Sequence, residues 1–139
     1  MHAFPECEEL QRAGSDAIFD ITGDNGSCED AAAAGAVECM IRTLDLFPYS
    51  ADTQRTILVA LAGLTVVEAN VHRAGSAGGV RLAFHALRSF PNDAHLITDA
   101  LLVLGNISIE DQFREEALTL GALALVVAAL RRYFLFLFR

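Results

Sequence analysis

The sequence has no tryptophan, few prolines and cysteines (three of each), and a charged share of only 20%. The scarcity of proline, with a hydrophobic share of 53%, argues against intrinsic disorder and favours a chain that buries a core. Cys7, Cys28 and Cys39 are odd in number and lack metal-ligand spacing, which argues against a disulfide framework and a cysteine metal site. We therefore expect buried, reduced thiols in an intracellular protein.

An excess of basic residues is also missing. The net charge of −8 argues against non-specific binding to nucleic acid, which a basic face would serve. The N-terminal segment MHAFPECEEL lacks the basic and apolar regions of a secretory signal. The apolar stretch 118–130 has 13 residues, whereas a membrane-spanning helix needs about 20. We expect neither a nucleic-acid nor a membrane partner, and a cytoplasmic protein, with the nucleus as the alternative location.

What the sequence does contain is a repeat with a period of 43 residues. The segment LLVLGNIS at 101–108 resembles VALAGLTV at 59–66 and, less closely, DAIFDIT at 16–22, and residues 102–108, 59–65 and 16–22 align at this interval. A period of about 40–47 residues is typical of arrays of two- or three-helix repeats. Other triplets keep the same interval: Phe4-Pro5, Phe47-Pro48 and Phe90-Pro91; Gly35, Gly78 and Gly121; and Leu44, Leu87 and Leu130.

Apolar residues recur at i, i+3, i+4 and i+7 throughout the chain, which predicts amphipathic helices and no strand. We expect long helices over 5–22, 52–67 and 93–108, the last capped by Asn92 or Asp93. Short helices are expected over 27–34, 68–74 and 110–118, and medium helices over 36–47, from Gly78-Gly79 and from Gly121. The predicted buried stripes of the long helices are Gly14, Ala17, Ile18 and Ile21; Ile57, Ala60, Leu61 and Leu64; and Ala100, Val103, Leu104 and Ile107. Those of the medium helices are Val37, Met40, Ile41 and Leu44; Val80, Ala83, Phe84 and Leu87; and Leu123, Val126, Val127 and Leu130.

The pattern defines one array over residues 1–139, with units at about 4–46, 47–89 and 90–132 and an apolar tail at 133–139. Tyr133 to Phe138 has no polar face, so we expect self-association through uncapped ends, relieved by deletion of residues 133–139. Gly78, between a short and a medium helix, is expected at or beside a position of positive φ.

The glycine steps Ala34-Gly35-Ala36-Val37, Ala77-Gly78-Gly79-Val80 and Leu120-Gly121-Ala122-Leu123 and the segment Leu104-Gly105-Asn106-Ile107-Ser108 carry a family resemblance. Together with the period, they make the chain similar to the armadillo-repeat family, which includes armadillo/β-catenin-like and importin-α-like repeats. The resemblance implies an all-α fold, a right-handed α-solenoid of about three three-helix repeats. HEAT repeats are the alternative architecture.

Armadillo arrays bind extended peptides along a concave surface lined by their third helices. In the family, a signature asparagine holds the peptide backbone and a tryptophan one turn earlier packs against its side chains. Here the asparagine position reads Asp20, Gly63, Asn106 and the tryptophan position reads Asp16, Val59, Leu102. We expect these six residues to form the partner-binding row, for a ligand with a basic residue followed by an apolar one. The alternatives are that the row is solvated surface and that Asn106 bridges neighbouring repeats.

Catalytic patterns are not apparent in the sequence. His2, His72, His85 and His95 are scattered, and the glycine-rich stretches at 23–27 and 75–79 lack the P-loop lysine. We therefore expect no enzyme, no cofactor and no metal, but a protein-interaction module whose partner is a protein or an extended peptide. A structural fragment of a longer array without its own peptide site is one alternative, and a nuclear transport adaptor is another.

Overall fold

A computed structural model describes residues 7–137, with side chains as far as Phe134, and 82% of the described residues are helical with no strand among them. The predicted all-α fold is confirmed. The helices are α1 (Glu8–Ile21), α2 (Asn25–Ala33), α3 (Ala36–Leu46), α4 (Ala51–Leu64), α5 (Glu68–Ser76), α6 (Gly79–Ser89), α7 (Ala94–Ile107), α8 (Asp111–Leu120) and α9 (Ala122–Leu137).

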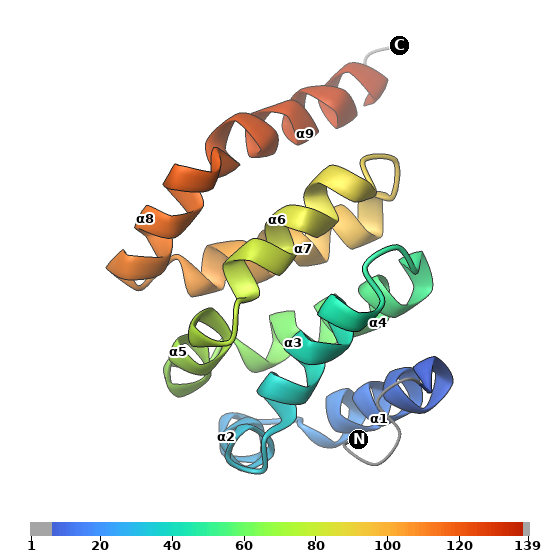
Figure 1. Ribbon diagram of the computed structural model, residues 1–139, viewed down its shortest axis with the longest axis vertical. Coiled ribbons are helices and arrows are strands. Elements are labelled where there is room, and N and C mark those ends of the chain that lie inside the picture. Colours follow the sequence, from blue (N-terminus) through green and yellow to red (C-terminus); the bar gives the residue numbers. More distant parts are fainter. Residues whose placement is uncertain (1–6, 138–139) are drawn as a thin grey trace.

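Equivalent helices lie next to one another in three parallel rows (Figure 1). The long helices α1, α4 and α7 form one row, and the medium helices α3, α6 and α9 form a second row that covers one side of the first. The short helices α2, α5 and α8 line one edge. The two ends of the stack are therefore α1 and α9, and every extensive contact joins helices of the same or of adjacent units.

Each turn between a short and a medium helix depends on a glycine. Gly35, Gly78 and Gly121 have φ angles of 91°, 102° and 83°, and they are the only residues with positive φ in the described part of the chain. A β-carbon is disfavoured in this left-handed region, so glycine recurs there at each interval of 43 residues. The prediction for Gly78 is confirmed.

The core lies between the long and medium rows. The predicted stripes of α3, α4 and α7 are all buried, and so is that of α6 except for the half-buried Phe84. Asp93, one of the two predicted caps of α7, accepts a hydrogen bond from the backbone N–H of Leu96 at 3.1 Å. In the glycine-rich stretch at 23–27, Asp24 caps α2, and Asn25, Gly26 and Ser27 already belong to that helix.

The predicted stripe of the first long helix is wrong in its outer part. Ile21 is 75% exposed and Ala17 is exposed, whereas Gln11 and Ser15 are buried against neighbouring helices. The physical reason is positional. α4 contacts α3, the medium helix that precedes it, whereas no medium helix precedes α1 within residues 7–137. The contact of α1 with α3 lies on its buried side, where Gln11 accepts a hydrogen bond from Thr43. The predicted start of this helix, at residues 5 and 6, lies outside the described residues.

The predicted stripe of α9 is also wrong. Leu123 is 63% and Leu130 is 60% exposed, Val127 is exposed as well, and only Val126 is half-buried. The same helix is longer than its counterparts, which end before the Phe-Pro pairs at 47–48 and 90–91. At the equivalent position Phe134 replaces proline, so nothing in the sequence interrupts the helical hydrogen bonds and α9 continues to Leu137.

The thiols follow the prediction in part. Cys28 is buried and Cys39 is half-buried, but Cys7 is exposed because it precedes the first turn of α1, and none of the three forms a disulfide bond within the described residues. Across residues 7–137, no single helix is long and apolar enough to span a membrane. The segments Asp111–Leu120 and Ala122–Phe134 meet the length and composition criteria only as a pair, and they are bent by 71°.

Candidate binding surface

The outer face of the long-helix row carries the six residues that the sequence singles out. Asp16 and Asp20 on α1 are exposed, and Leu102 on α7 is 51% exposed. Val59 and Gly63 on α4 are half-buried between them. Phe19 of α1 leans over Gly63, with its Cε2 atom 3.3 Å from the place a β-carbon would take. The candidate residues are therefore exposed on α1 and α7 and partly covered on α4, the middle helix.

Asn106 is tied to the neighbouring long helix. Its Nδ2 donates to the carbonyl oxygen of Ala62 at 3.3 Å and to Oγ1 of Thr65 at 3.1 Å. Thr65 in turn donates its hydroxyl proton to the carbonyl oxygen of Leu61 at 2.7 Å. The asparagine therefore bridges adjacent repeats, which is one of the two roles considered from the sequence.

A shallow groove between α1 and α4 adds residues that sequence reasoning missed. Its volume is about 220 Å³ and its walls are Glu9, Arg12, Ala13, Asp16 and Thr56. Arg12 reaches toward Asp52 of α4, with Nη1 3.8 Å from Oδ2. Among the described residues, no side chain forms an ion pair with Glu9, Asp16 or Asp20. The spacing of Glu9 and Asp16, seven residues apart on one helix, is the signal that could have identified this acidic face.

Asp99 extends the acidic character to α7. It lies at the position equivalent to Ala13 and Thr56, and it is half-buried. Burial raises the pKa of its carboxyl because desolvation disfavours the charged form, and His95 offsets this only in part. A cation placed beside this carboxyl by a ligand would favour its ionised form. The long-helix face thus presents carboxylates at both ends of the row and an apolar side chain, Leu102, near Asp99.

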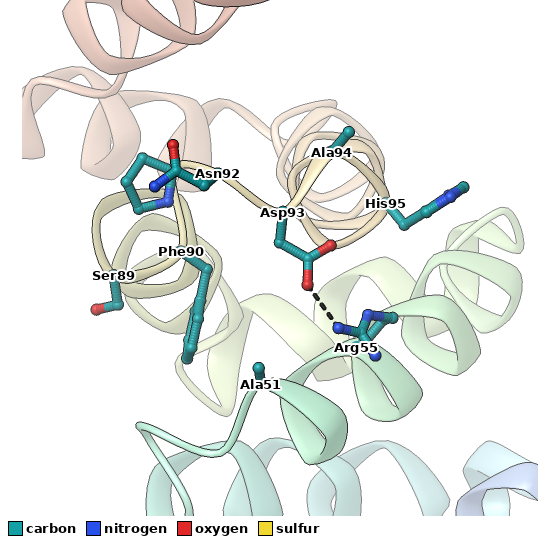
Figure 2. Close-up of a pocket in the computed structure, with 9 residues that line it drawn as sticks. Ala51, Arg55, Ser89, Phe90, Asn92, Asp93, Ala94 and His95 are labelled. Carbon is teal, nitrogen blue, oxygen red and sulfur yellow. Dashed lines mark hydrogen bonds and ion pairs between the residues drawn. The ribbon is translucent and has the colours of Figure 1, made fainter.

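A larger pocket lies at the edge of the row, where the turn between α6 and α7 meets the start of α4 (Figure 2). Its volume is about 590 Å³. Figure 2 shows Asp93 directed from the turn toward Arg55 of α4, and the ion pair between Oδ2 and Nη2 measures 2.6 Å. The hydrogen bond from Arg55, followed by that from the N–H of Leu96, holds the pKa of Asp93 below its ordinary value.

The charged groups of this pocket satisfy one another. Arg55 also pairs with Asp52 at 3.1 Å, and its two acidic partners raise the pKa of the guanidinium. The ion pair between Arg55 and Asp93 therefore links α4 to the start of α7. His95, one of the four histidines scattered along the sequence, is exposed and lines this pocket. Within the described part of the chain, no three His, Cys, Asp or Glu side chains converge as metal ligands.

Comparison of the chain with protein-family models, with curated proteins and with solved structures finds no match.

Proposed function

We propose that the chain is an armadillo-like, right-handed solenoid that acts as a non-enzymatic protein-interaction module. The 43-residue period, the three glycine turns at positive φ and the three rows of helices support the repeat type. In armadillo arrays the third helices line the concave side, and α1, α4 and α7 hold that place here. The ligand is an extended peptide that crosses this row of long helices.

The observation that carries the proposal is the pairing of unneutralised acids with an exposed aliphatic residue on one face. Glu9, Asp16 and Asp20 of α1 have no basic partner among the described residues, and Leu102 is half exposed two helices away. A basic ligand side chain would meet the α1 carboxylates, and an apolar side chain would cover Leu102. Carboxylates left without partners on an interaction surface favour a cationic ligand.

Peptide titration tests this proposal. The probes are short unstructured peptides that carry one arginine and one leucine at increasing separation, with a matched set in which glutamate replaces arginine. We expect binding by the arginine set alone, weakened about threefold or more at low salt by Asp16→Asn with Asp20→Asn, and weakened again by Leu102→Ala.

The control variant is Glu29→Gln with Asp30→Asn on α2, which removes the same charge from exposed positions in the short-helix row. Equal weakening by the control would show a non-specific charge effect and overturn the assignment of the face. Binding of neither peptide set would overturn the proposed ligand class.

A second candidate function is a structural or assembly subunit. The specific observation that favours it is the apolar surface that remains exposed on α1 and α9, at the two ends of the stack. This candidate does not require a peptide ligand, and both functions are compatible with the same fold.

A further inference from the structure

The last medium helix, α9, exposes an apolar stripe whose equivalent on α6 is covered. Leu123, Val127 and Leu130 lie at intervals of four and three residues on one face of α9, and all three are exposed. Their equivalents on α6 are Val80, Phe84 and Leu87, which are buried or half-buried. The most extensive contact of α6 is with the long helix α7. Within residues 7–137, no long helix occupies the same position on α9.

A groove lies between α7 and α9, beside the exposed stripe of α9. It has a volume of about 360 Å³ and largely apolar walls, which include Ile97 and Leu101 from α7 and Ala129, Leu130 and Tyr133 from α9. Inside the chain, α7 packs both on the preceding long helix, α4, and on the preceding medium helix, α6. A long helix placed in this groove would make the same two contacts, with α7 and with α9.

The first long helix, α1, exposes the complementary face. Leu10, Ala17 and Ile21 are exposed and Gly14 is half-buried. Their equivalents on α4 are Thr53, Ile57, Ala60 and Leu64, which are all buried. α4 contacts α3, the medium helix that precedes it, and α7 contacts α6 in the same way, so the exposed face of α1 corresponds to a buried face on each of the other long helices.

The two exposed stripes match in spacing, size and charge. Leu10, Gly14, Ala17 and Ile21 follow one another at intervals of four, three and four residues, and the α9 stripe begins with the same intervals. If the two stripes packed together, the small residues Gly14 and Ala17 would leave room for the larger Val127 and Leu130, as interdigitating helices require.

The charges near the C-terminal end of α9 and at the start of α1 are complementary as well. The last turns of α9 carry Arg131 and Arg132, and the first turn of α1 carries Glu8 and Glu9. In the repeat numbering, Arg132 corresponds to Ser89 and Glu9 corresponds to His95, and those two residues line one pocket at the α6–α7 turn. If α1 of a second copy followed α9 with the geometry of the α6–α7 turn, Arg132 of one copy and Glu9 of the other would lie close together.

We propose that a second copy of the chain seats its α1 in the groove between α7 and α9, so that copies continue the array head to tail. The contact is heterologous, since one copy contributes α1 and the other contributes α7 and α9, and it leaves a free groove and a free α1 at the ends of every assembly. It uses the apolar side of α1 and leaves the acidic side, with Glu9 only at its margin, for a peptide ligand. It therefore does not depend on the proposed peptide binding.

A complementation experiment tests the junction on the whole chain. Ile21→Glu blocks the α1 face, and Leu130→Glu blocks the groove; both residues are exposed, so both variants keep the helical circular dichroism of the wild type. Mass is measured by light scattering and sedimentation from micromolar to sub-millimolar concentration. We expect the mass of the wild type to rise with concentration beyond that of a dimer. Each variant alone is expected to be monomeric, because a charge in an apolar interface weakens association at least about tenfold. An equimolar mixture forms a one-to-one heterodimer, because each variant retains the half of the junction that the other lacks.

The control is Ile109→Glu, which places the same charge at an exposed isoleucine in the turn before α8 and leaves assembly unchanged. Dimers of Ile21→Glu alone, with no gain on mixing, would show a symmetric α9 contact and overturn the head-to-tail arrangement. A wild-type chain that is monomeric at every concentration would overturn the proposal entirely.

Discussion

The side-chain amide of Asn106 spans two long helices, because its Nδ2 lies within hydrogen-bond distance of Ala62 O and Thr65 Oγ1 at the C-terminal end of α4. Asn106 therefore links α4 to α7 and also belongs to the row of candidate binding residues.

We expect Asn106→Ala to lower the free energy of unfolding by about 1 kcal/mol, because two hydrogen bonds to α4 are lost. Chemical denaturation measures the change, with Asn25→Ala at an exposed position of α2 as the control. If the unfolding midpoint were unchanged and only peptide affinity fell, the role of Asn106 would lie in ligand contact.

The turn glycines give a second prediction. Gly78 has φ 102°, so Gly78→Ala places a β-carbon in the left-handed region and is expected to destabilise the chain by about 1–2 kcal/mol. Gly105 is an exposed helical glycine with open space around it, and Gly105→Ala should stabilise α7 by about 0.5–1 kcal/mol. Thermal unfolding of both variants should shift in opposite directions, and shifts of the same sign would contradict the account of the turn.

A close approach between α5 and α8 gives a third. A β-carbon on Gly75 would lie 2.2 Å from Cε2 of Phe113, a buried ring of α8. We expect Gly75→Ala to cost about 1–3 kcal/mol through overpacking, and Phe113→Leu in the same chain to recover part of that loss. Additive effects of the two substitutions, measured by urea unfolding, would show that the contact is not the cause.

The ion pair in the edge pocket gives a prediction for pH. The folded pKa of Asp93 is below its ordinary value, owing to Arg55 and to the N–H of Leu96, so ionised Asp93 stabilises the fold above about pH 4. This contribution is lost as the pH falls through the folded pKa. The difference in unfolding free energy between wild type and Asp93→Asn should be full at neutral pH and shrink steadily below about pH 4. A difference that stayed constant down to strongly acidic pH would exclude the ion pair as its source.

Periodicity predicted the interior of the array and failed at its ends. The stripes of α4 and α7 are buried as their spacing indicates, because each of these helices packs on the medium helix that precedes it, α3 or α6. Spacing identifies the apolar face of a helix but not whether a neighbour covers it, and for this reason Ile21, Leu123 and Leu130 were wrongly expected to be buried. The extension of α9 depends on a single residue, Phe134, at a position where the other repeats have proline.

The candidate site was predictable to a similar degree. The exposure of Leu102 follows from its helical phase relative to the buried stripe of α7. Asp16 and Asp20 are exposed as expected, although the stripe predicted for their helix is partly wrong. The bond partners of Asn106 do not follow from helical phase, because Ala62 and Thr65 are more than forty residues away and only the packing of α4 on α7 brings them into reach. The raised pKa of Asp99 likewise depends on burial, which the sequence pattern does not specify.

The restriction of extensive contacts to adjacent units has a consequence for how the chain opens. Because α1 and α9 share no extensive contact, either end can unravel while the other stays intact. Backbone amides of α4 and α6, held from both sides, should exchange with solvent more slowly than those of the two terminal helices. A ligand that lies across all three long helices binds only while α1 is docked, so occupancy of the surface would itself protect the N-terminal end from exchange.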